Sequence, residues 1–279
     1  MNTFLFGTAG IPLSTPGSST IDGIYHLKAL GLDALEIEFV RQVYLTEKTA
    51  LETAEAARDS VVKLSAHAPY YLNLNAAEPE KTAKSRALLF KAASIASLAG
   101  AYCLVFHPGY YLKNTSEDTF KEILTNLTKV TSQLEEAGSI INLAPETSGK
   151  PSQFGTLEEI LQLCTSLGGV TPCIDFAHLH AYSGVVNTYE EFAGILDRVS
   201  AILGKEALGK LHLHVSGIHY GLKGELKHLP LDESDFNYPQ LLQALIDANA
   251  GGVIICESPA MEADALVLKT KYHQLKAKR

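Results

Sequence analysis

The chain alternates between short apolar segments and longer segments with helical periodicity, and this alternation constrains the fold more than any other feature. Apolar and β-branched runs predict eight strands, at residues 3–8, 34–39, 61–66, 102–106, 140–145, 170–174, 210–215 and 252–256. Helical segments lie between them, for example from Glu80 to Leu98 and from Thr119 to Leu134. Strands that alternate with helices form parallel sheets, so eight of them predict a closed (β/α)8 barrel, the TIM barrel of the α/β class.

Local signals mark where several of the predicted helices begin and end. Thr156 with Glu159, and Thr188 with Glu191, have the spacing of a capping box, in which side chains satisfy the free amides of the first turn. Glycines just before the next strand predict left-handed helix ends, namely Gly31, Gly100, Gly138, Gly168 and Gly251. No linker or change of composition divides the 279 residues, and we expect one domain, residues 1–279.

Composition narrows the cellular setting. No run approaches the roughly 18 apolar residues that a membrane span needs, and the first residues, MNTFLFGTAG, lack the basic and apolar parts of a signal peptide. The four cysteines are scattered and form no CxxC pair, which is typical of a reducing compartment. We therefore expect a cytoplasmic monomer without membrane contact.

Six consecutive predicted strands end in side chains that bind metal ions. These side chains are His67, His107, Glu146, Asp175 with His178, His212 with His214, and Glu257. Each alone is weak evidence, because a single histidine is more often structural and Asp175 or Glu257 could cap a helix. In a barrel, however, these strand ends meet at one face, where active sites lie. Charged groups gathered in one apolar mouth need partners or metal, so the pattern predicts a metal centre.

The number of candidate ligands exceeds what one ion needs. Zinc takes four ligands, or three with a position open to water, and carboxylates can bridge ions, so two or three metals are expected. Such sites suit phosphoester hydrolysis, in which one ion activates water and another stabilises the leaving oxygen. The net charge of −8 by itself argues against binding nucleic acid, although divalent ions would offset it locally.

Several stretches resemble the endonuclease IV family, the zinc-dependent apurinic/apyrimidinic endonucleases of the xylose-isomerase-like barrel superfamily. They run from residue 65 to 259 and read SAHAPYYLNL, VFHPGYY, LAPETSGKPSQFGT, CIDFAHLHA, LHLHVSG, KHLPL and CESP. The run EIEFVRQVYL is similar to the archaeal-type branch. The resemblance implies a DNA-repair enzyme that hydrolyses the phosphodiester of double-stranded DNA 5′ to an abasic site, with two or three zinc ions or with manganese.

The resemblance also implies a role for each candidate ligand. One zinc would bind His67, His107 and the bridging carboxylate Glu146, which is the expected catalytic residue. A second would bind Glu146, Asp175, His212 and Glu257, and a third would bind His178 and His228. His212 aligns with the family's ligand, whereas His214 stands where the family often has asparagine.

Other residues are expected to contact the DNA. Tyr70 matches a tyrosine that the family uses near the damaged nucleotide. Arg41 and Lys150, with Lys223 and Lys227, lie in or near predicted loops at the barrel mouth and could contact the phosphate backbone, although they could equally be ordinary solvated loop charges.

One position departs from the family pattern. Bacterial members have an acid two residues before the histidine that matches His228, and here that residue is Leu226. The adjacent Glu225 could substitute, but a shift of one residue along an extended segment turns the side chain to the other face. His214 and His219 are other candidate replacements at the third site.

Two other functions remain open on the sequence. A sugar isomerase or epimerase of the same superfamily would use Glu146, Asp175, His212 and Glu257 for one manganese or cobalt ion, with carboxylates transferring protons. The additional histidines favour the endonuclease, since a one-metal isomerase does not need them all. A metal-binding scaffold without activity is the third alternative.

Overall fold

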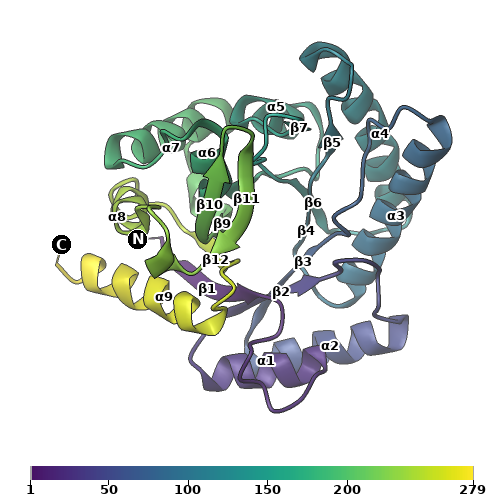
Figure 1. Ribbon diagram of the computed structural model, residues 1–279. Coiled ribbons are helices and arrows are strands. Elements are labelled where there is room, and N and C mark those ends of the chain that lie inside the picture. Colours follow the sequence, from purple (N-terminus) through teal and green to yellow (C-terminus); the bar gives the residue numbers. More distant parts are fainter. Residues whose placement is uncertain (1, 279) are drawn as a thin grey trace.

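Eight parallel strands lie side by side in the order β6-β4-β3-β2-β1-β12-β9-β8 in the computed structural model, which describes residues 2–278. Their bounds are β1 (Phe4–Ala9), β2 (Ala34–Glu38), β3 (Lys63–His67), β4 (Cys103–Phe106), β6 (Asn142–Pro145), β8 (Cys173–Asp175), β9 (Leu211–Val215) and β12 (Gly252–Cys256). Helices surround them on the outside (Figure 1). The predicted TIM barrel is confirmed, and every predicted strand is present within three residues of its expected ends.

The barrel closes between β6 and β8 by a weaker connection than elsewhere. Continuous ladders join the other neighbouring strands, but here two isolated bridges pair Leu143 with Val170 and Glu146 with Cys173. Individual bonds support them, such as the amide of Thr147 donating to the carbonyl of Cys173 at 3.1 Å. The barrel is therefore nearly closed, with a seam beside Glu146.

The helices follow the strands in the expected alternation. They are α1 (Thr20–Ala29), α2 (Glu47–Ser60), α3 (Pro79–Leu98), α4 (Ser116–Glu136), α5 (Leu157–Ser166), α6 (Phe176–Ser183), α7 (Tyr189–Leu203), α8 (Tyr238–Asp247) and α9 (Glu262–Lys276), with 3-10 turns η1 (Lys205–Lys210) and η2 (Leu231–Glu233). Both predicted capping boxes are confirmed, at Thr156 for α5 and at Thr188 for α7. Within residues 2–278, no helix combines the length and apolarity needed to cross a membrane.

The prediction of left-handed glycines is confirmed at three of five positions. Gly31, Gly100 and Gly138 have positive φ, but Gly168 and Gly251 do not. After α5 the left-handed residue is Gly169, and after α8 it is Asn249, since asparagine also tolerates this conformation. Gly251 is needed for a different reason, because a Cβ there would lie 2.8 Å from the backbone oxygen of Thr3.

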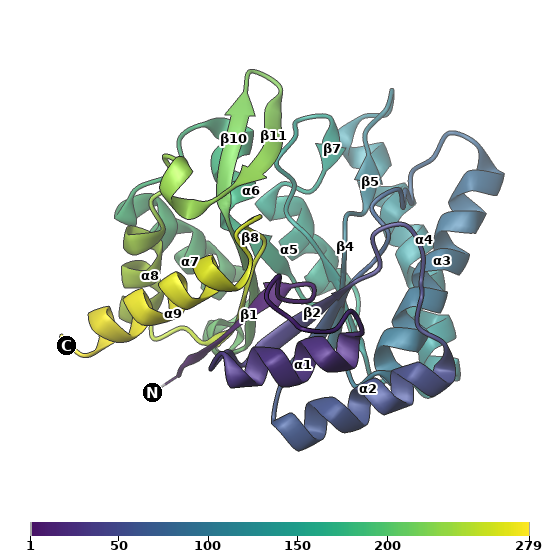
Figure 2. The same cartoon turned by 60° about the horizontal axis from the view of Figure 1, so that its bottom comes forward.

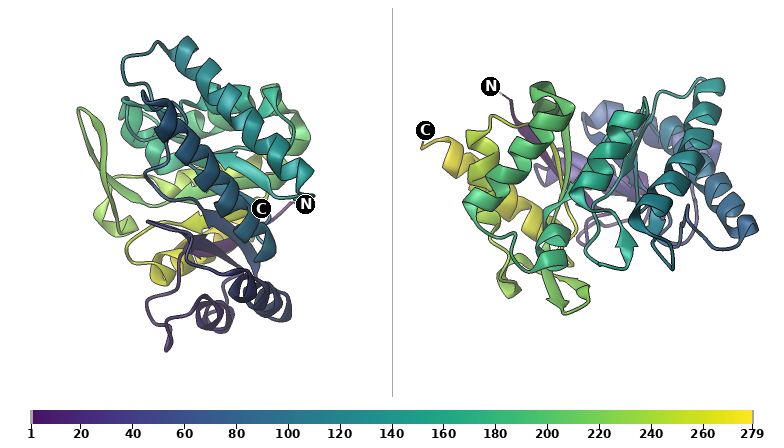
Figure 3. Two further views of the ribbon diagram at one scale, coloured as in Figure 1. Left: turned by 90° about the vertical axis from the view of Figure 1, so that its right-hand side faces the viewer. Right: turned by 90° about the horizontal axis from the view of Figure 1, so that it is seen from above.

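Two short antiparallel pairs were not predicted. β5 (Gly109–Tyr110) pairs with β7 (Gln153–Phe154), and β10 (Gly217–Gly221) forms a hairpin with β11 (Gly224–Leu229). Figure 2 shows both pairs at the same end of the barrel, where the loops that follow β4, β6 and β9 lie. The β10–β11 hairpin projects beyond the body of the molecule (Figure 3). These pairs extend the rim around the barrel mouth.

The barrel interior has an apolar floor and a polar upper layer. Small buried clusters fill the floor, with Ala34, Val253 and Ile255 in one and Cys103, Val105, Ala144 and Cys173 in another. Side chains alternate between the two faces of a strand. On β9, Leu211, Leu213 and Val215 therefore join the outer core under the helices, while His212 and His214 point inward. The same alternation points Glu36, Glu38 and Glu146 into the barrel.

Candidate metal centre

His67 and His107 meet Glu146 in the first group of candidate ligands. The Nε2 atoms of both histidines lie close to Oε2 of Glu146, at 3.2 Å for His67 and 3.3 Å for His107. His67 is the last residue of β3, and His107 and Glu146 directly follow β4 and β6; these strands are neighbours in the barrel, and Glu146 is buried. The structure thus brings together the three residues expected at the first site.

The second group contains Glu146, Asp175, Glu257 and His214. Nδ1 of His214 lies 3.1 Å from Oε1 of Glu146 and 3.3 Å from Oε1 of Glu257. The resemblance to endonuclease IV implies His212 as the ligand here, and the structure places His214 in this group instead. The physical reason is register: β9 pairs with β8 so that His214 stands level with Asp175, whereas His212 stands level with Cys173, deeper in the barrel.

The third group contains Asp175, His178, His228 and Glu257. The Nε2 atoms of His178 and His228 are 3.3 Å apart, and Nδ1 of His178 lies 3.4 Å from Oδ2 of Asp175. Asp175 is also the N-cap of α6, accepting the amide of His178 at 2.7 Å through Oδ1. The helix-cap role and the metal-facing position thus use different oxygens of the same carboxylate.

Glu225 joins this third group because the hairpin contains a β-bulge. Its Oε2 lies 3.5 Å from Nε2 of His178. Lys227 pairs with His219 and Glu225 pairs with Tyr220, so Leu226 has no partner in the ladder. One extra residue reverses the alternation of the strand. Glu225 and His228 therefore face the same side, and Leu226 is exposed to solvent.

Backbone carbonyls fix the orientation of three of these histidines. Nδ1 of His67 lies 2.8 Å from the carbonyl of Ala68, Nδ1 of His178 lies 3.1 Å from that of Thr147, and Nδ1 of His228 lies 3.1 Å from that of Glu257. A carbonyl only accepts, so Nδ1 must carry the proton in each ring. When such a ring is neutral, its Nε2 has a free lone pair, as metal-binding histidines require.

The charges of the cluster depend strongly on one another. Burial alone would raise the pKa of Glu146, but the surrounding histidines, His107 and His214 foremost, hold it well below its ordinary value. Burial opposes protonation of His178, yet Asp175 and Glu146 raise its pKa well above normal. Burial raises the pKa of Asp175 to about 7 and lowers that of His107 to about 4. Without metal, the carboxylates are therefore balanced by protons held on histidines.

The arrangement fits divalent metal ions. Zinc bonds of about 2.0–2.2 Å place the ligand atoms of a tetrahedral site roughly 3.3–3.6 Å apart, close to the separations within the three groups. Oδ2 of Asp175 and Nδ1 of His107 are buried and make no hydrogen bond within residues 2–278. Imidazole and carboxylate ligands suit zinc and manganese. Because Glu146 belongs to the first and second groups, and Asp175 and Glu257 belong to the second and third, the groups form one continuous cluster.

The residues expected to contact DNA lie outside this cluster. Tyr70 is exposed and lines a cavity of about 590 Å³ together with Tyr71, Tyr110 and Lys84. Arg41 is exposed on the loop after β2. Lys150 Nζ lies 3.7 Å from Oε2 of Glu225, so it borders the third group directly. Lys223 and Lys227 are exposed on the β10–β11 hairpin.

A deeper polar layer was missed by sequence reasoning. Glu36 is completely buried beneath the second group, and it accepts hydrogen bonds from Ser65 at 2.7 Å and from His212 at 3.0 Å. Burial raises the pKa of the neighbouring Glu38 to about 8, and its Oε1 has no hydrogen bond among the described residues. A signal was present: two glutamates alternate with Leu35 and Ile37 along a strand whose other face is buried.

Comparison with known proteins agrees with this architecture. A family model described as xylose isomerase-like TIM barrel matches residues 24–276. The chain is 46% identical over 272 residues to an uncharacterized protein of Methanocaldococcus jannaschii, covering 97% of each chain. It is 27% identical over 203 residues to a probable endonuclease 4 of Mycoplasma genitalium, covering 71% of this chain and 67% of that protein.

Solved structures of proteins with different names have the same fold. Endonuclease IV from Thermus thermophilus aligns with a TM-score of 0.73 and 22% identity, covering 98% of this chain and 100% of that one. A D-tagatose 3-epimerase-like protein aligns with a TM-score of 0.70 and 20% identity, covering 88% and 90%. At these identities the likeness is one of fold.

Proposed function

The chain belongs to the family of xylose isomerase-like TIM barrels, and from that premise we propose that it is a metal-dependent phosphodiesterase that cleaves double-stranded DNA 5′ to abasic sites. The ions are two or three zinc ions, with manganese as the alternative. The sequence similarity to a probable endonuclease 4 supports this reaction.

The observation that carries the proposal is the continuity of three ligand groups. His67 and His107 lie on one oxygen of Glu146, while His214 lies on the other. His178, His228 and Glu225 extend the cluster on the far side of Asp175. A single ion could bind only some of these buried ionisable groups. The others would then be buried without a metal partner, which is costly in free energy.

Each part of the mouth has a role in this proposal. Glu146 would hold two ions at a fixed separation through its two oxygens. When bound, the ions supply Lewis acidity that activates water at neutral pH and neutralises the scissile phosphate. Lys150 borders the third group, and Lys223 and Lys227 are exposed on the hairpin that carries His228; the three side chains would bind the flanking phosphates. The exposed ring of Tyr70 would stack beside the damaged nucleotide.

The test is metal content together with strand cleavage. Purified protein should hold two or three ions per chain and nick a duplex that carries one abasic-site analogue. His107→Ala should lose one metal equivalent and most of the cleavage, while Tyr25→Phe on the exposed face of α1 serves as the control. Protein that binds several metals but leaves the duplex intact would refute the nuclease proposal.

A single-metal sugar epimerase is the second candidate. The observation that favours it is that Glu146, Asp175, His214 and Glu257 alone form a complete four-ligand set. Glu146 and Glu257 lie on the same nitrogen of His214, so the two carboxylates could exchange protons with a substrate between them. In this case His107→Ala would spare the one metal, and the wild-type protein would interconvert ketoses.

A further inference from the structure

His214 faces Glu146 through Nδ1, whereas His67 and His107 face it through Nε2. In His67, His178 and His228 a backbone carbonyl holds the proton on Nδ1, although Nδ1 of His178 also lies 3.3 Å from Oε1 of Glu146. His214 presents Nδ1 to Glu146 and Glu257. If this nitrogen is to bind a metal, the ring proton must lie on Nε2, and an acceptor must keep it there.

That acceptor is Glu36. Oε1 of Glu36 lies 2.9 Å from Nε2 of His214, and both residues are completely buried. Among the described residues Oε1 makes no hydrogen bond, so both of its lone pairs are available to accept this proton. The carboxylate is itself held in place, because the hydroxyl of Ser65 donates to Oε2 at 2.7 Å.

His212 supports the same carboxylate from below. Its Nε2 lies 3.0 Å from Oε2 of Glu36, and since a carboxylate only accepts, this nitrogen carries the proton. Nδ1 of His212 is then an acceptor, and it receives the hydroxyl of Tyr102. The Nε2 atoms of His212 and His214 lie 3.3 Å apart, and each lies closer to an oxygen of Glu36 than to the other ring. With both protons on Nε2, Glu36 is therefore the shared acceptor, and the contact between the two rings is not a hydrogen bond.

We propose that Glu36 is a positioning residue that holds the proton of His214 on Nε2 and so keeps Nδ1 free to bind metal. The inference rests on the metal centre of the proposed function. In this arrangement His212, which the resemblance to endonuclease IV implies as a metal ligand, instead donates a hydrogen bond that holds Glu36 in place. Outer partners of this kind typically change metal affinity 10–100-fold when they are removed.

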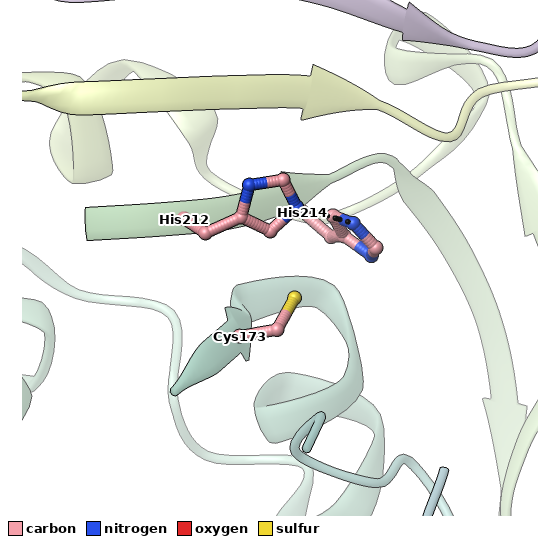
Figure 4. A group of neighbouring side chains, drawn as sticks. All are labelled: Cys173, His212 and His214. Atoms are coloured by element: carbon pink, nitrogen blue, oxygen red, sulfur yellow. Dashed lines mark hydrogen bonds between the residues drawn. The ribbon is translucent and has the colours of Figure 1, made fainter. Parts of the chain in front are cut away.

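A rival use of the same histidines is a deeper metal site. The thiol of Cys173 points toward the rings of His212 and His214, and the ligand atoms of the three residues lie within 4.8 Å of one another (Figure 4). A metal there would need the Nε2 lone pairs of the two rings. The two arrangements therefore require opposite proton positions on His214, which makes them separable by experiment.

The experiment compares wild-type protein with Glu36→Gln and with the matched control Glu55→Gln, the same change at an exposed position of α2. Zinc affinity is measured by titration calorimetry, and the proton position on His214 is read from long-range ¹⁵N–¹H NMR spectra of metal-free and zinc-loaded protein. We expect wild-type His214 to carry its proton on Nε2. Glu36→Gln should weaken one metal equivalent at least 10-fold, because an amide can donate to Nε2 and move the proton to Nδ1. Glu55→Gln should behave as wild type.

Three results would overturn the proposal. One is a Glu36→Gln variant with unchanged zinc affinity and unchanged His214 spectra. Another is a wild-type His214 with its proton on Nδ1, a measurement that does not depend on the folding of any variant. The third is a thiolate-to-cobalt absorption band in cobalt-loaded wild type that disappears in Cys173→Ser, since it places a metal at the deeper site. Wild-type protein that binds no metal would refute the proposed function instead, and the NMR measurement would still decide what Glu36 does to His214.

Discussion

Oε2 of Glu225 lies 3.5 Å from Nε2 of His178, although a regular strand would turn Glu225 away from the side on which His228 faces His178. The bulge at Leu226 makes this contact, and it brings an acid to the third group one residue away from position 226, where the resemblance to endonuclease IV implies one. The bulge in the β10–β11 hairpin therefore compensates for the leucine at position 226.

If Glu225 is a ligand, Glu225→Gln should remove one metal equivalent and leave the others. The amide keeps the size of the side chain but loses its charge, so the loss would be electrostatic. Metal analysis after dialysis measures this directly. Leu226→Ala, at an exposed side chain, is the control and should keep full metal content. Equal metal content in both variants would exclude Glu225.

Gly149→Ala should weaken the same site without changing any charge. A Cβ at this position would lie 2.8 Å from Cβ of Glu225 and 3.0 Å from Cδ2 of His178. The added methyl must push Glu225 outward, at a cost of about 1–3 kcal/mol in the free energy of unfolding. Gly168→Ala, which meets nothing within 4 Å, is the matched control. The prediction fails if both variants hold metal equally well in a competition titration.

Glu146→Gln should affect two ions together. The substitution leaves one neutral oxygen and one amide nitrogen between His67, His107 and His214, so both adjoining groups lose their shared anion. Metal content should fall by one or two equivalents, and cleavage should fall by more than the 10–100-fold that outer partners cost. Circular dichroism should be unchanged. Retained metal and activity would show that Glu146 bridges nothing.

His214→Asn and His212→Asn should differ. His214 lies in the ligand group, so its replacement should remove a metal equivalent. His212 is level with Cys173, deeper in the barrel than the pair of His214 and Asp175. Its replacement should therefore lower the affinity for metal without changing the number of ions bound at saturation. Metal counts at saturating zinc distinguish the two variants, and the reverse pattern would restore His212 as the ligand.

Metal-free protein should lose stability between pH 7 and pH 10. Burial opposes protonation of His67, but the hydrogen bond that it donates to Glu146 and the charges of Glu38 and Glu146 raise its pKa from 6.5 to about 10. A raised histidine pKa gives stability that is complete below pH 6.5 and is lost as pH rises through the folded value. Burial raises the pKa of Glu38 from 4.5 to about 8, which acts in the same direction over a lower range.

Urea unfolding of chelator-treated protein at pH 7 and pH 10 checks this expectation. His67→Asn should show a flatter dependence of the unfolding free energy on pH over this interval. A wild-type profile that rises toward pH 10 would contradict the assignment of the proton to His67.

The sequence predicted the barrel well because each strand is a short apolar run between helices with clear capping residues, such as Thr156 and Thr188. It also predicted that His67, His107 and Glu146 would meet, since strand ends converge in a barrel. It could not choose between His212 and His214. Both face inward, and only the pairing of β9 with β8 decides which of them is level with Asp175.

The remaining features depend on three-dimensional detail that periodicity does not encode. The bulge at Leu226 is a local shift in pairing, and without it Glu225 would point away from His178. Glu36 becomes meaningful only when β2 and β9, which are 176 residues apart at the contact of Glu36 with His212, face each other across the barrel.

The seam between β6 and β8 gives the metal centre a mechanical consequence. Glu146 stands at one edge of the seam and Asp175 at the other, and the ladder between the two strands consists of isolated bridges. An ion bound by both carboxylates would link β6 and β8 across the seam. The barrel could then open at the seam only if the ion were released. Amide hydrogens at this edge, such as those of Leu143 and Thr147, would then exchange with solvent slowly in the loaded protein and quickly after chelation. Loss of the ion would therefore loosen the barrel at this edge and leave the continuous ladders between the other strands in place.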